Sequence, residues 1–500
     1  MKKIMNVSSW LALLLVAPQL VAAQNLMEMV RAREAAVPAV GAGSPVMVAA
    51  FKPVPNPDYQ DPNGALPPNL TDAHVQALLK KMVTAEFSTL PPNATPEQIT
   101  LRKEDVMRLV GNLVTIDRNY VDTIPASVWD KAVADMGDTA AQEYAKTRNW
   151  DSTVNSMLKT AAGKMLDPFS VYWTKEEYKR FSDQMTNSFV GVGMILKEDG
   201  TIDIVIPGGP ADKAGLKAGD KIVAVDGAAV STSEAIIKKT LGKEGTPVKI
   251  TVQRSGAALA PFNIVRGQVT TRNVYSKLAA KGVGYLYLGQ FSPDCDKEMI
   301  AAIGKLKDKG ARKLIIDVRG NPGGTVDSVS SLLSEFMKDK QTIVSFKSKG
   351  QVMYSNVTEG DGRFLDMPVA VLINEGSASA SEILAGAIQD VRGPVIVGSR
   401  SYGKGTMQTV LPDQQGRALK LTIGRWYTPR DRSIDAQHDP VTREKVKGTG
   451  GVVPDYMIVL TEAQEQDIMK QLYREVQGAA PDGAPVADPV LQKGLELLSK

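Results

Sequence analysis

Apolar and polar positions follow two different periods along the chain. From residue 69 to about residue 187, apolar residues recur every three or four positions, which is the period of an amphipathic helix. Thr71 and Asp72 can cap the first of these helices. The segments expected to be helical are 72–82, 101–120, 127–146, 151–165 and 175–185. The pattern therefore predicts an N-terminal helical region over residues 69–187.

At about residue 188 the pattern changes to short β-type runs between Gly, Pro and Asp turns. The runs expected to form strands are 190–196, 202–206, 221–227 and 248–253. They lie within about 80 residues that leave room for only one or two helices. Residues 188–268 are therefore predicted to form a compact, mostly β domain.

After residue 269, strands and helices alternate along the chain. The continuous apolar runs 284–288, 313–318 and 369–374 predict buried strands, and the segments 296–309, 328–337 and 380–389 predict helices between and after them. Such alternation indicates an α/β core, here residues 269–460. Residues 461–500 contain two further helical segments joined by a Pro/Ala/Gly linker at 478–489.

The N-terminus has the pattern of an export signal. Lys2 and Lys3 precede a short apolar run at 10–17, and small residues at 21–23 offer a cleavage site. The run is too short to span a bilayer comfortably, so we expect a signal peptide over residues 1–23 and no stable membrane span. Residues 24–68 are rich in Pro, Ala and Gly and predict an extended arm.

Composition and charge exclude several classes of function. The formal charge is +4, or +2 without Lys2 and Lys3, which gives no reason to expect nucleic acid as a partner. Cys295 is the one cysteine, so no intrachain disulfide is expected, and a buried thiol is the ordinary interpretation. With only two histidines, the common zinc clusters are not expected, and neither a metal nor another cofactor is predicted.

Two Gly-rich turns follow two of the buried strands, at 317–324 and 374–382. Glycines and helix starts there can present backbone N–H groups, as an oxyanion hole requires. Ser377, Ser379 and Ser381 lie in the second turn, and chemistry alone does not choose among them, since each can also cap a helix. Lys404 lies between two glycines, where burial would lower its pKa and let it take a proton from a serine.

A rival pairing uses the Ser-x-x-Lys pattern of penicillin-recognising enzymes. Ser401 with Lys404 fits this pattern, and so does Ser156 with Lys159. The companion motifs of that class are absent or out of order, and a four-residue pattern this loose arises by chance. This interpretation is therefore disfavoured.

At this point a specific resemblance appears. The run 377–387 (SASASEILAGA), followed by Asp390, by 402–405 (YGKG) and by Gln408, resembles the signature of the C-terminal processing, or tail-specific, peptidases. Asp390 lies 11 positions and Lys404 25 positions after Ser379, in agreement with that signature. The resemblance implies that Ser379 is the nucleophile, Lys404 the base and Gln408 the residue that orients Lys404. Asp390 would support the site structurally.

The first Gly-rich turn shares in the resemblance. Residues 319–324 (RGNPGG) match the family turn that supplies one oxyanion-hole N–H, which we assign to Gly324 rather than Gly323. The other donor would be the amide of Ala380. The fold that the family implies is α/β, with a crotonase-like peptidase core, an inserted mostly-β PDZ domain and a helical N-terminal region.

The β domain resembles a bacterial-type PDZ domain, through 191–193 (GVG), 207–211 (PGGPA) and 214–220 (AGLKAGD). A PDZ domain binds an extended C-terminus by strand addition and holds its carboxylate with loop N–H groups. The candidate carboxylate loop consists of Val190, Gly191, Val192 and Gly193. A PDZ fold kept only as a scaffold stays an alternative.

Two stretches depart from the family pattern, namely 130–160 and an insertion at 434–453 that contains His438. They leave oligomerisation and access to the site open, and a loop histidine is more often solvated than catalytic. The resemblance implies an exported serine endopeptidase of the bacterial periplasm that captures protein tails with free C-termini and cleaves them by a Ser-Lys mechanism. A homo-oligomer or an activating adaptor protein stays open as a partner, and a catalytically inactive PDZ adaptor is the alternative function.

Overall fold

The computed structural model describes Val54–Pro55 and residues 69–91, 100–185, 188–360, 362–439, 444–479 and 483–499. The expected signal peptide at 1–23 and nearly all of the expected arm at 24–68 lie outside these ranges. The first described domain is helical, as the periodicity predicts. It consists of α4 (Asp72–Phe87), α5 (Lys103–Asn119), α6 (Ala126–Thr147) and α7 (Trp150–Met165).

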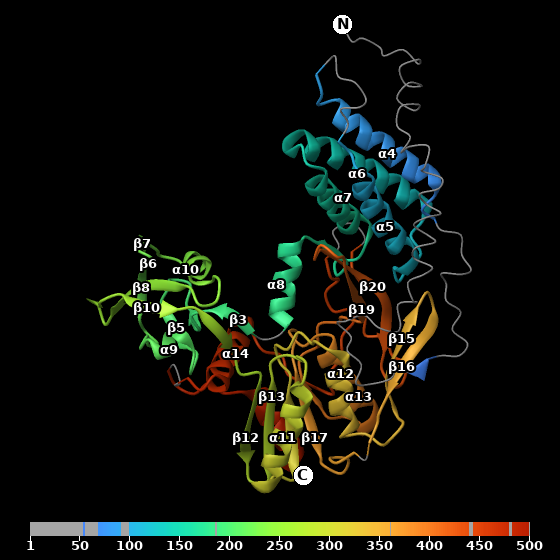
Figure 1. Cartoon of the computed structure of the whole chain (residues 1–500). Helices are drawn as coiled ribbons and strands as arrows, with labels where there is room; N and C mark the ends of the chain where they lie inside the picture. The colour runs from blue at the N-terminus through green and yellow to red at the C-terminus, as the bar shows by residue number, and fades with distance from the viewer. Residues whose placement is uncertain are drawn as a thin grey trace.

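The mostly β domain forms a separate lobe (Figure 1). Its longer elements are β3 (Ser188–Gly191), β4 (Met194–Leu196), β5 (Ile202–Val205), β6 (Lys221–Val225), α10 (Ser233–Thr240), β8 (Pro247–Arg254), β10 (Phe262–Val265) and β11 (Gly267–Thr270). It has its own apolar cluster, which includes Ile222, Ile236 and Ile250. One strand was expected over 190–196, but Gly193 takes a φ of 80° and divides this run into β3 and β4.

The peptidase-like core is built on a six-stranded sheet in the order β12-β13-β14-β17-β18-β21. Its strands are β12 (Val274–Ala280), β13 (Val283–Leu288), β14 (Lys313–Asp317), β17 (Val369–Ile373), β18 (Ile396–Gly398) and β21 (Tyr456–Met457). From β13 onward all neighbours pair in parallel. Parallel pairing brings the carboxyl ends of β14 and β17 to the same edge of the sheet, where the two Gly-rich turns begin.

Helices cover both faces of this sheet, which explains the continuous apolar runs in its strands. One face packs against α11 (Cys295–Asp308), α12 (Val326–Ser334) and α13 (Ala380–Arg392). The other packs against α14 (Glu462–Val476) and α15 (Pro489–Ser499). In β14, for example, Ile316 faces the first layer and Ile315 the second. The helix expected over 328–337 begins and ends earlier, at Val326 and Ser334.

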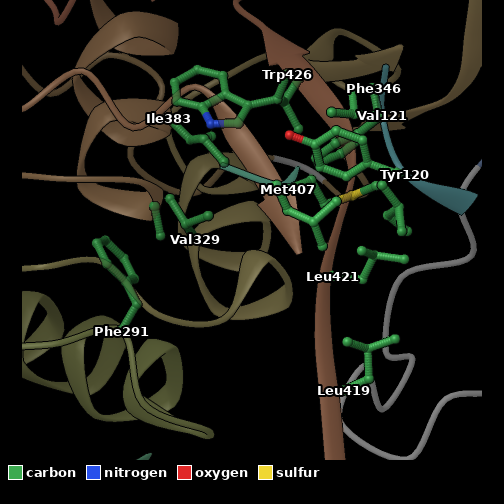
Figure 2. Close-up of a cluster of buried hydrophobic side chains, with 14 of the residues drawn as sticks. Tyr120, Val121, Phe291, Val329, Phe346, Ile383, Met407, Leu419, Leu421 and Trp426 are labelled. Atoms are coloured by element: carbon green, nitrogen blue, oxygen red, sulfur yellow. The ribbon is translucent and has the colours of Figure 1, made fainter. Parts of the chain in front are cut away.

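A second, antiparallel sheet was not predicted from the sequence. It has the order β1-β16-β15-β20-β19, with β2 (Val171–Trp173) also paired to β20. Its main strands are β15 (Thr342–Ser348), β16 (Gln351–Val357), β19 (Thr406–Pro412) and β20 (Ala418–Tyr427). Figure 2 shows Trp426 of this sheet beside Ile383 of α13, with Tyr120 and Val121 of the helical region nearby. The helical region therefore packs against the sheet that carries the segment after Lys404.

Candidate active site

The two Gly-rich turns are joined to each other by hydrogen bonds. Asn374 Oδ1 accepts the N–H of Gly320 at 2.8 Å, and Ser377 Oγ donates to the carbonyl oxygen of Val318 at 2.8 Å. Ser381 Oγ donates to the carbonyl oxygen of Asn321 at 2.9 Å. Ser377 and Ser381 are both fully buried. Their hydroxyl groups thus serve to connect the turns.

Ser379 differs from its two neighbours. It is partly exposed, and among the described residues its hydroxyl group donates to no acceptor. It lies where β17 passes through the turn into α13, with φ 54° and ψ −115°. This left-handed backbone conformation is strained for a residue with a side chain. A serine on a strained strand–turn–helix connection is a geometry that exposes a nucleophilic oxygen.

Glu382 lies one turn into α13, completely buried, and binds both segments of interest. Its Oε2 accepts the N–H of Ser379 at 2.8 Å and the N–H of Lys404 at 2.9 Å. Its Oε1 accepts the hydroxyl of Ser401 and the N–H of Gly403, both at 2.6 Å. Burial raises the pKa of Glu382, although all four donors favour the carboxylate. One side chain therefore fixes the backbone of Ser379 relative to that of Lys404.

Lys404 lies in a tight loop whose glycines are required by packing. A Cβ at Gly405 would lie 2.6 Å from Asp435, and one at Gly403, where φ is 90°, would lie 2.9 Å from Ala436. The segment 434–453, expected to be an insertion, thus packs directly on the Lys404 loop. Ala436 donates its N–H to the carbonyl oxygen of Gly403 at 2.9 Å.

The amine of Lys404 is in a mostly apolar setting. Burial lowers the pKa of Lys404 to about 8, and the nearby charge of Lys420 acts in the same direction, while Glu382 and Asp167 oppose it. The Nζ atom lies 5.3 Å from the centre of the Phe169 ring. The carbonyl oxygen of Lys404 accepts the indole N–H of Trp426 at 2.9 Å. A lysine with this pKa is partly neutral near pH 7, so it can act as a base.

The side chains of Ser379 and Lys404 do not form a hydrogen bond with each other in the described part of the chain, so direct contact between them stays a prediction. No hydrogen bond joins Gln408 to Lys404 among the described residues. Gln408 Nε2 donates instead to Thr406 Oγ1 at 2.8 Å and to Thr422 Oγ1 at 3.2 Å. Its expected role therefore also stays a prediction.

The backbone amides of the two Gly-rich turns differ in their partners among the described residues. The N–H of Gly323 donates to Asn321 Oδ1 at 2.8 Å, whereas those of Gly324 and Ala380 have no acceptor among the described residues. A Cβ at Gly323 would lie 2.8 Å from the amide nitrogen of Ala380, so the two turns approach each other closely. The assignment of Gly324 and Ala380 as the oxyanion donors stays a prediction.

Asp390, at the far end of α13, has a structural set of partners. It is buried, and it accepts the N–H of Arg430 at 2.9 Å and a guanidinium N–H of Arg432 at 2.5 Å. It thus fixes the turn that follows β20. This agrees with a supporting role and with no direct part in the chemistry.

The other candidates have ordinary partners. Ser401 is buried, donates to Glu382 and accepts the N–H of Val452 at 2.6 Å, so its hydroxyl is occupied. Cys295 is buried, and burial raises the pKa of its thiol to about 12. His438 lies edge-on to Phe169, with ring centres 5.9 Å apart. A role for His438 in the reaction is therefore not supported by its contacts.

Two family models match parts of this chain. The model of peptidase family S41 matches residues 282–458, and a PDZ domain model matches residues 201–254. The carboxy-terminal processing protease CtpB of Bacillus subtilis is 32% identical over 343 residues, which cover 65% of this chain and 71% of that protein. CtpA of the same organism is 33% identical over 336 residues, or 66% and 70%. This chain belongs to the carboxy-terminal processing peptidases of family S41.

A solved structure, that of the photosystem II D1 C-terminal processing protease, covers 77% of this S41 peptidase and 99% of its own chain. The two sequences are 24% identical, and the TM-score of the structural match is 0.47. Within the described ranges, no helix of the S41 peptidase is both long and apolar enough to cross a bilayer.

The candidate carboxylate loop of the PDZ domain has two parts. Val190 and Gly191 belong to β3 and pair with β11. Val192 and Gly193 form the turn into β4, and their carbonyl oxygens accept the N–H groups of Ala211 at 2.7 Å and Ile206 at 3.0 Å. Among the described strands, β4 pairs only with β5. Its second edge therefore has no partner strand among the described residues, which is a condition for tail binding by strand addition.

Glu382 is a candidate site residue that the sequence patterns do not single out. Ser379 followed by Glu three positions later is a capping box, and this ordinary explanation is correct as far as the helix is concerned. The same carboxylate also binds the Lys404 loop, more than 20 residues away in sequence. These hydrogen bonds to the Lys404 loop are evident only in the fold, because no local sequence pattern predicts them.

Proposed function

We propose that this S41 peptidase is an exported serine endopeptidase that captures protein C-terminal tails through its PDZ domain and cleaves near them by a Ser-Lys mechanism. The observation that carries the proposal is the Glu382 carboxylate, which binds the backbone of both Ser379 and Lys404. The Ser379 hydroxyl, which donates to no acceptor among the described residues, and the lowered pKa of Lys404 support it.

The proposed reaction uses only groups of this chain and water. Neutral Lys404 takes the proton of Ser379 as Oγ bonds to the peptide carbonyl carbon, and the N–H groups of Gly324 and Ala380 hold the oxyanion. The C–N bond then breaks, and Lys404 gives its proton to the leaving amine. Water adds to the carbonyl carbon of the acyl-enzyme as Lys404 takes one of its protons. The bond from that carbon to Oγ then breaks, Lys404 returns the proton to Ser379 Oγ, and the new carboxylic acid is released. The Lys404 amine must approach Ser379 for these steps.

Export and tail capture are part of the same proposal. The signal-peptide pattern over residues 1–23 supports export, and we propose the bacterial periplasm as the site of action. The open edge of β4 beside the Val190–Gly193 loop supports binding of protein or peptide substrates with free C-termini. A second copy of this chain or an activating adaptor protein is a further candidate partner, and tail capture by the PDZ domain is compatible with either.

Cleavage of unfolded casein and of tailed peptides tests the proposal. We expect Ser379→Ala to abolish cleavage while a labelled tail peptide still binds. The alternative, an inactive PDZ adaptor, requires the unmodified protein and Ser379→Ala to be equally inactive while both bind tails. If Ser401→Ala abolished cleavage and Ser379→Ala did not, the nucleophile assignment would be wrong.

A further inference from the structure

Helix α14 extends from the catalytic turns to the PDZ domain (Figure 1). Near its start, Glu465 Oε1 accepts an amide N–H of Asn374 at 2.7 Å. Asn374 is the residue whose Oδ1 joins the two Gly-rich turns. One turn further on, the Met469 methyl group packs on Gly320, 3.0 Å from where a Cβ of that glycine would lie. The first half of α14 therefore contacts both catalytic turns.

The last turn of α14 contacts the PDZ domain through an ion pair. Arg474 donates to the carboxylate of Asp203 at 2.7 Å and to its carbonyl oxygen at 3.1 Å. Asp203 belongs to β5, and the side chains of Arg474 and Asp203 are only 9% and 12% exposed. Lys197 Nζ lies 3.9 Å from the same carboxylate, farther than Arg474 does. A buried, hydrogen-bonded ion pair holds its two partners in one geometry, so this contact connects α14 to the PDZ domain.

An apolar patch surrounds this ion pair. Ile204, Ile206 and Val269 of the PDZ domain are buried together, and Tyr473 of α14 packs against them. Ile195, from the middle of β4, packs against the same patch. Since β4 has the open edge that would receive a substrate tail, the strand that binds the tail and the helix that contacts the catalytic turns share one cluster of side chains.

The candidate carboxylate loop also touches this patch. A Cβ at Gly193 would lie 3.3 Å from both methyl groups of Val269, so the loop and Val269 are in close contact. A tail carboxylate seated on the loop would therefore act on Val269 directly. The contacts form an unbroken series from the tail loop, through Val269 and Tyr473, along α14 to Asn374.

Helix α14 has room to respond at its catalytic end. A cavity of about 460 Å³ lies between the helix and the second Gly-rich turn, lined from the helix by Glu465, Ile468 and Met469 and from the turn by Asn374 and Glu375. The cavity is partly open to solvent, so the α14 side chains that line it are not close-packed on that side and have space to move.

We propose that α14 couples tail binding in the PDZ domain to the geometry of the catalytic turns, with Arg474 and Asp203 as the pair that connects the two. The inference rests on the proposed function for its biological meaning, since it assigns the route by which a captured tail stimulates cleavage. Arg474 and Asp203 are positioning residues, because neither belongs to the turns that carry the reaction.

The experiment compares the unmodified protein with Arg474→Gln, Asp203→Asn and the double variant. The matched control is Asp467→Asn, which removes one charge from an exposed position of the same helix. A fluorescein-labelled peptide ending in Ala-Ala-Ala reports tail affinity by anisotropy. Hydrogen exchange at residues 319–324 and 374–379, with and without that peptide, reports the catalytic turns. Cleavage of one substrate with and without the same tail gives the stimulation by the tail.

In the unmodified protein and in Asp467→Asn, we expect the peptide to slow exchange in both turns and the tail to raise kcat/KM. In Arg474→Gln we expect this stimulation to fall about tenfold, within the usual range of coupling between sites, while cleavage of the tail-less substrate is retained. The double variant should lose no more than either single variant, since the two residues act as one pair.

Equal stimulation by the tail in Arg474→Gln and the unmodified protein would overturn the proposal. An equal loss on tailed and tail-less substrates would also overturn it, because it would indicate a general loss of folding. Failure of the proposed function is distinguishable: a protein that cleaves nothing, but whose catalytic turns still respond to the peptide through Arg474, would retain the coupling without the peptidase activity.

Discussion

The pH dependence of cleavage tests the role of Lys404 most directly. A protonated amine cannot accept the Ser379 proton, so the rate should follow the neutral fraction of Lys404. With a pKa of about 8, about one-tenth of the amines are neutral at pH 7, against about one in 3,000 at the ordinary value of 10.5. Burial of this lysine therefore increases the working fraction about 300-fold at neutral pH.

The assay is kcat/KM for an internally quenched peptide, measured between pH 6 and pH 10. We expect a rise of about 50-fold from pH 6 to pH 8, because the neutral fraction grows from about 1% to about one-half, and a further rise of about twofold to a plateau above about pH 9. Lys404→Arg should be inactive throughout, since guanidinium stays charged. Circular dichroism over the same range is the control for folding. A flat profile from pH 6 to pH 9 would refute a lysine base.

Three further predictions concern the surroundings of the site. Lys420→Met should shift the midpoint of the pH profile of cleavage to higher pH, because the positive charge of Lys420 helps to lower the pKa of Lys404. Lys420→Arg keeps that charge and should leave the midpoint unchanged. Glu382→Gln presents amide hydrogens to buried donors and should lower kcat at least about 100-fold, at a cost in stability of about 1–3 kcal/mol measured by denaturant unfolding; unchanged kcat would contradict its role. Gly323→Ala places a Cβ against the Ser379 turn and should abolish activity, while Gly208→Ala, which meets open space although its φ is also positive, should be active.

Much of the fold could be predicted from the sequence because its signals are local. The helices α4 and α7 begin at capping residues, Thr71 and Asn149, and β14 and β17 are continuous apolar runs. The antiparallel sheet was missed for a physical reason. Its strand β15 pairs with β20, which lies about 80 residues later in the sequence. The strand β19 directly follows the glycines around Lys404, a composition that is more typical of a loop. Pairing over such distances leaves little trace in local sequence.

The site shows the same division between local and distant information. Chemistry alone found a serine-rich helix start but could not choose among Ser377, Ser379 and Ser381. The acceptors that occupy Ser377 and Ser381 lie 59 and 60 residues earlier in the chain, in the other Gly-rich turn. The family resemblance selected Ser379, and the fold gives an independent physical reason for the same choice.

The backbone conformation of Ser379 implies a conflict between stability and catalysis. A non-glycine residue at φ 54° and ψ −115° costs about 1–3 kcal/mol, and a glycine would adopt this conformation with little cost. Ser379→Gly should therefore raise the midpoint of thermal unfolding while removing the nucleophile. Selection for folding alone would favour glycine at this position. If Ser379 is the nucleophile, as proposed, relatives that have lost proteolysis should drift toward glycine here before other parts of the turn change.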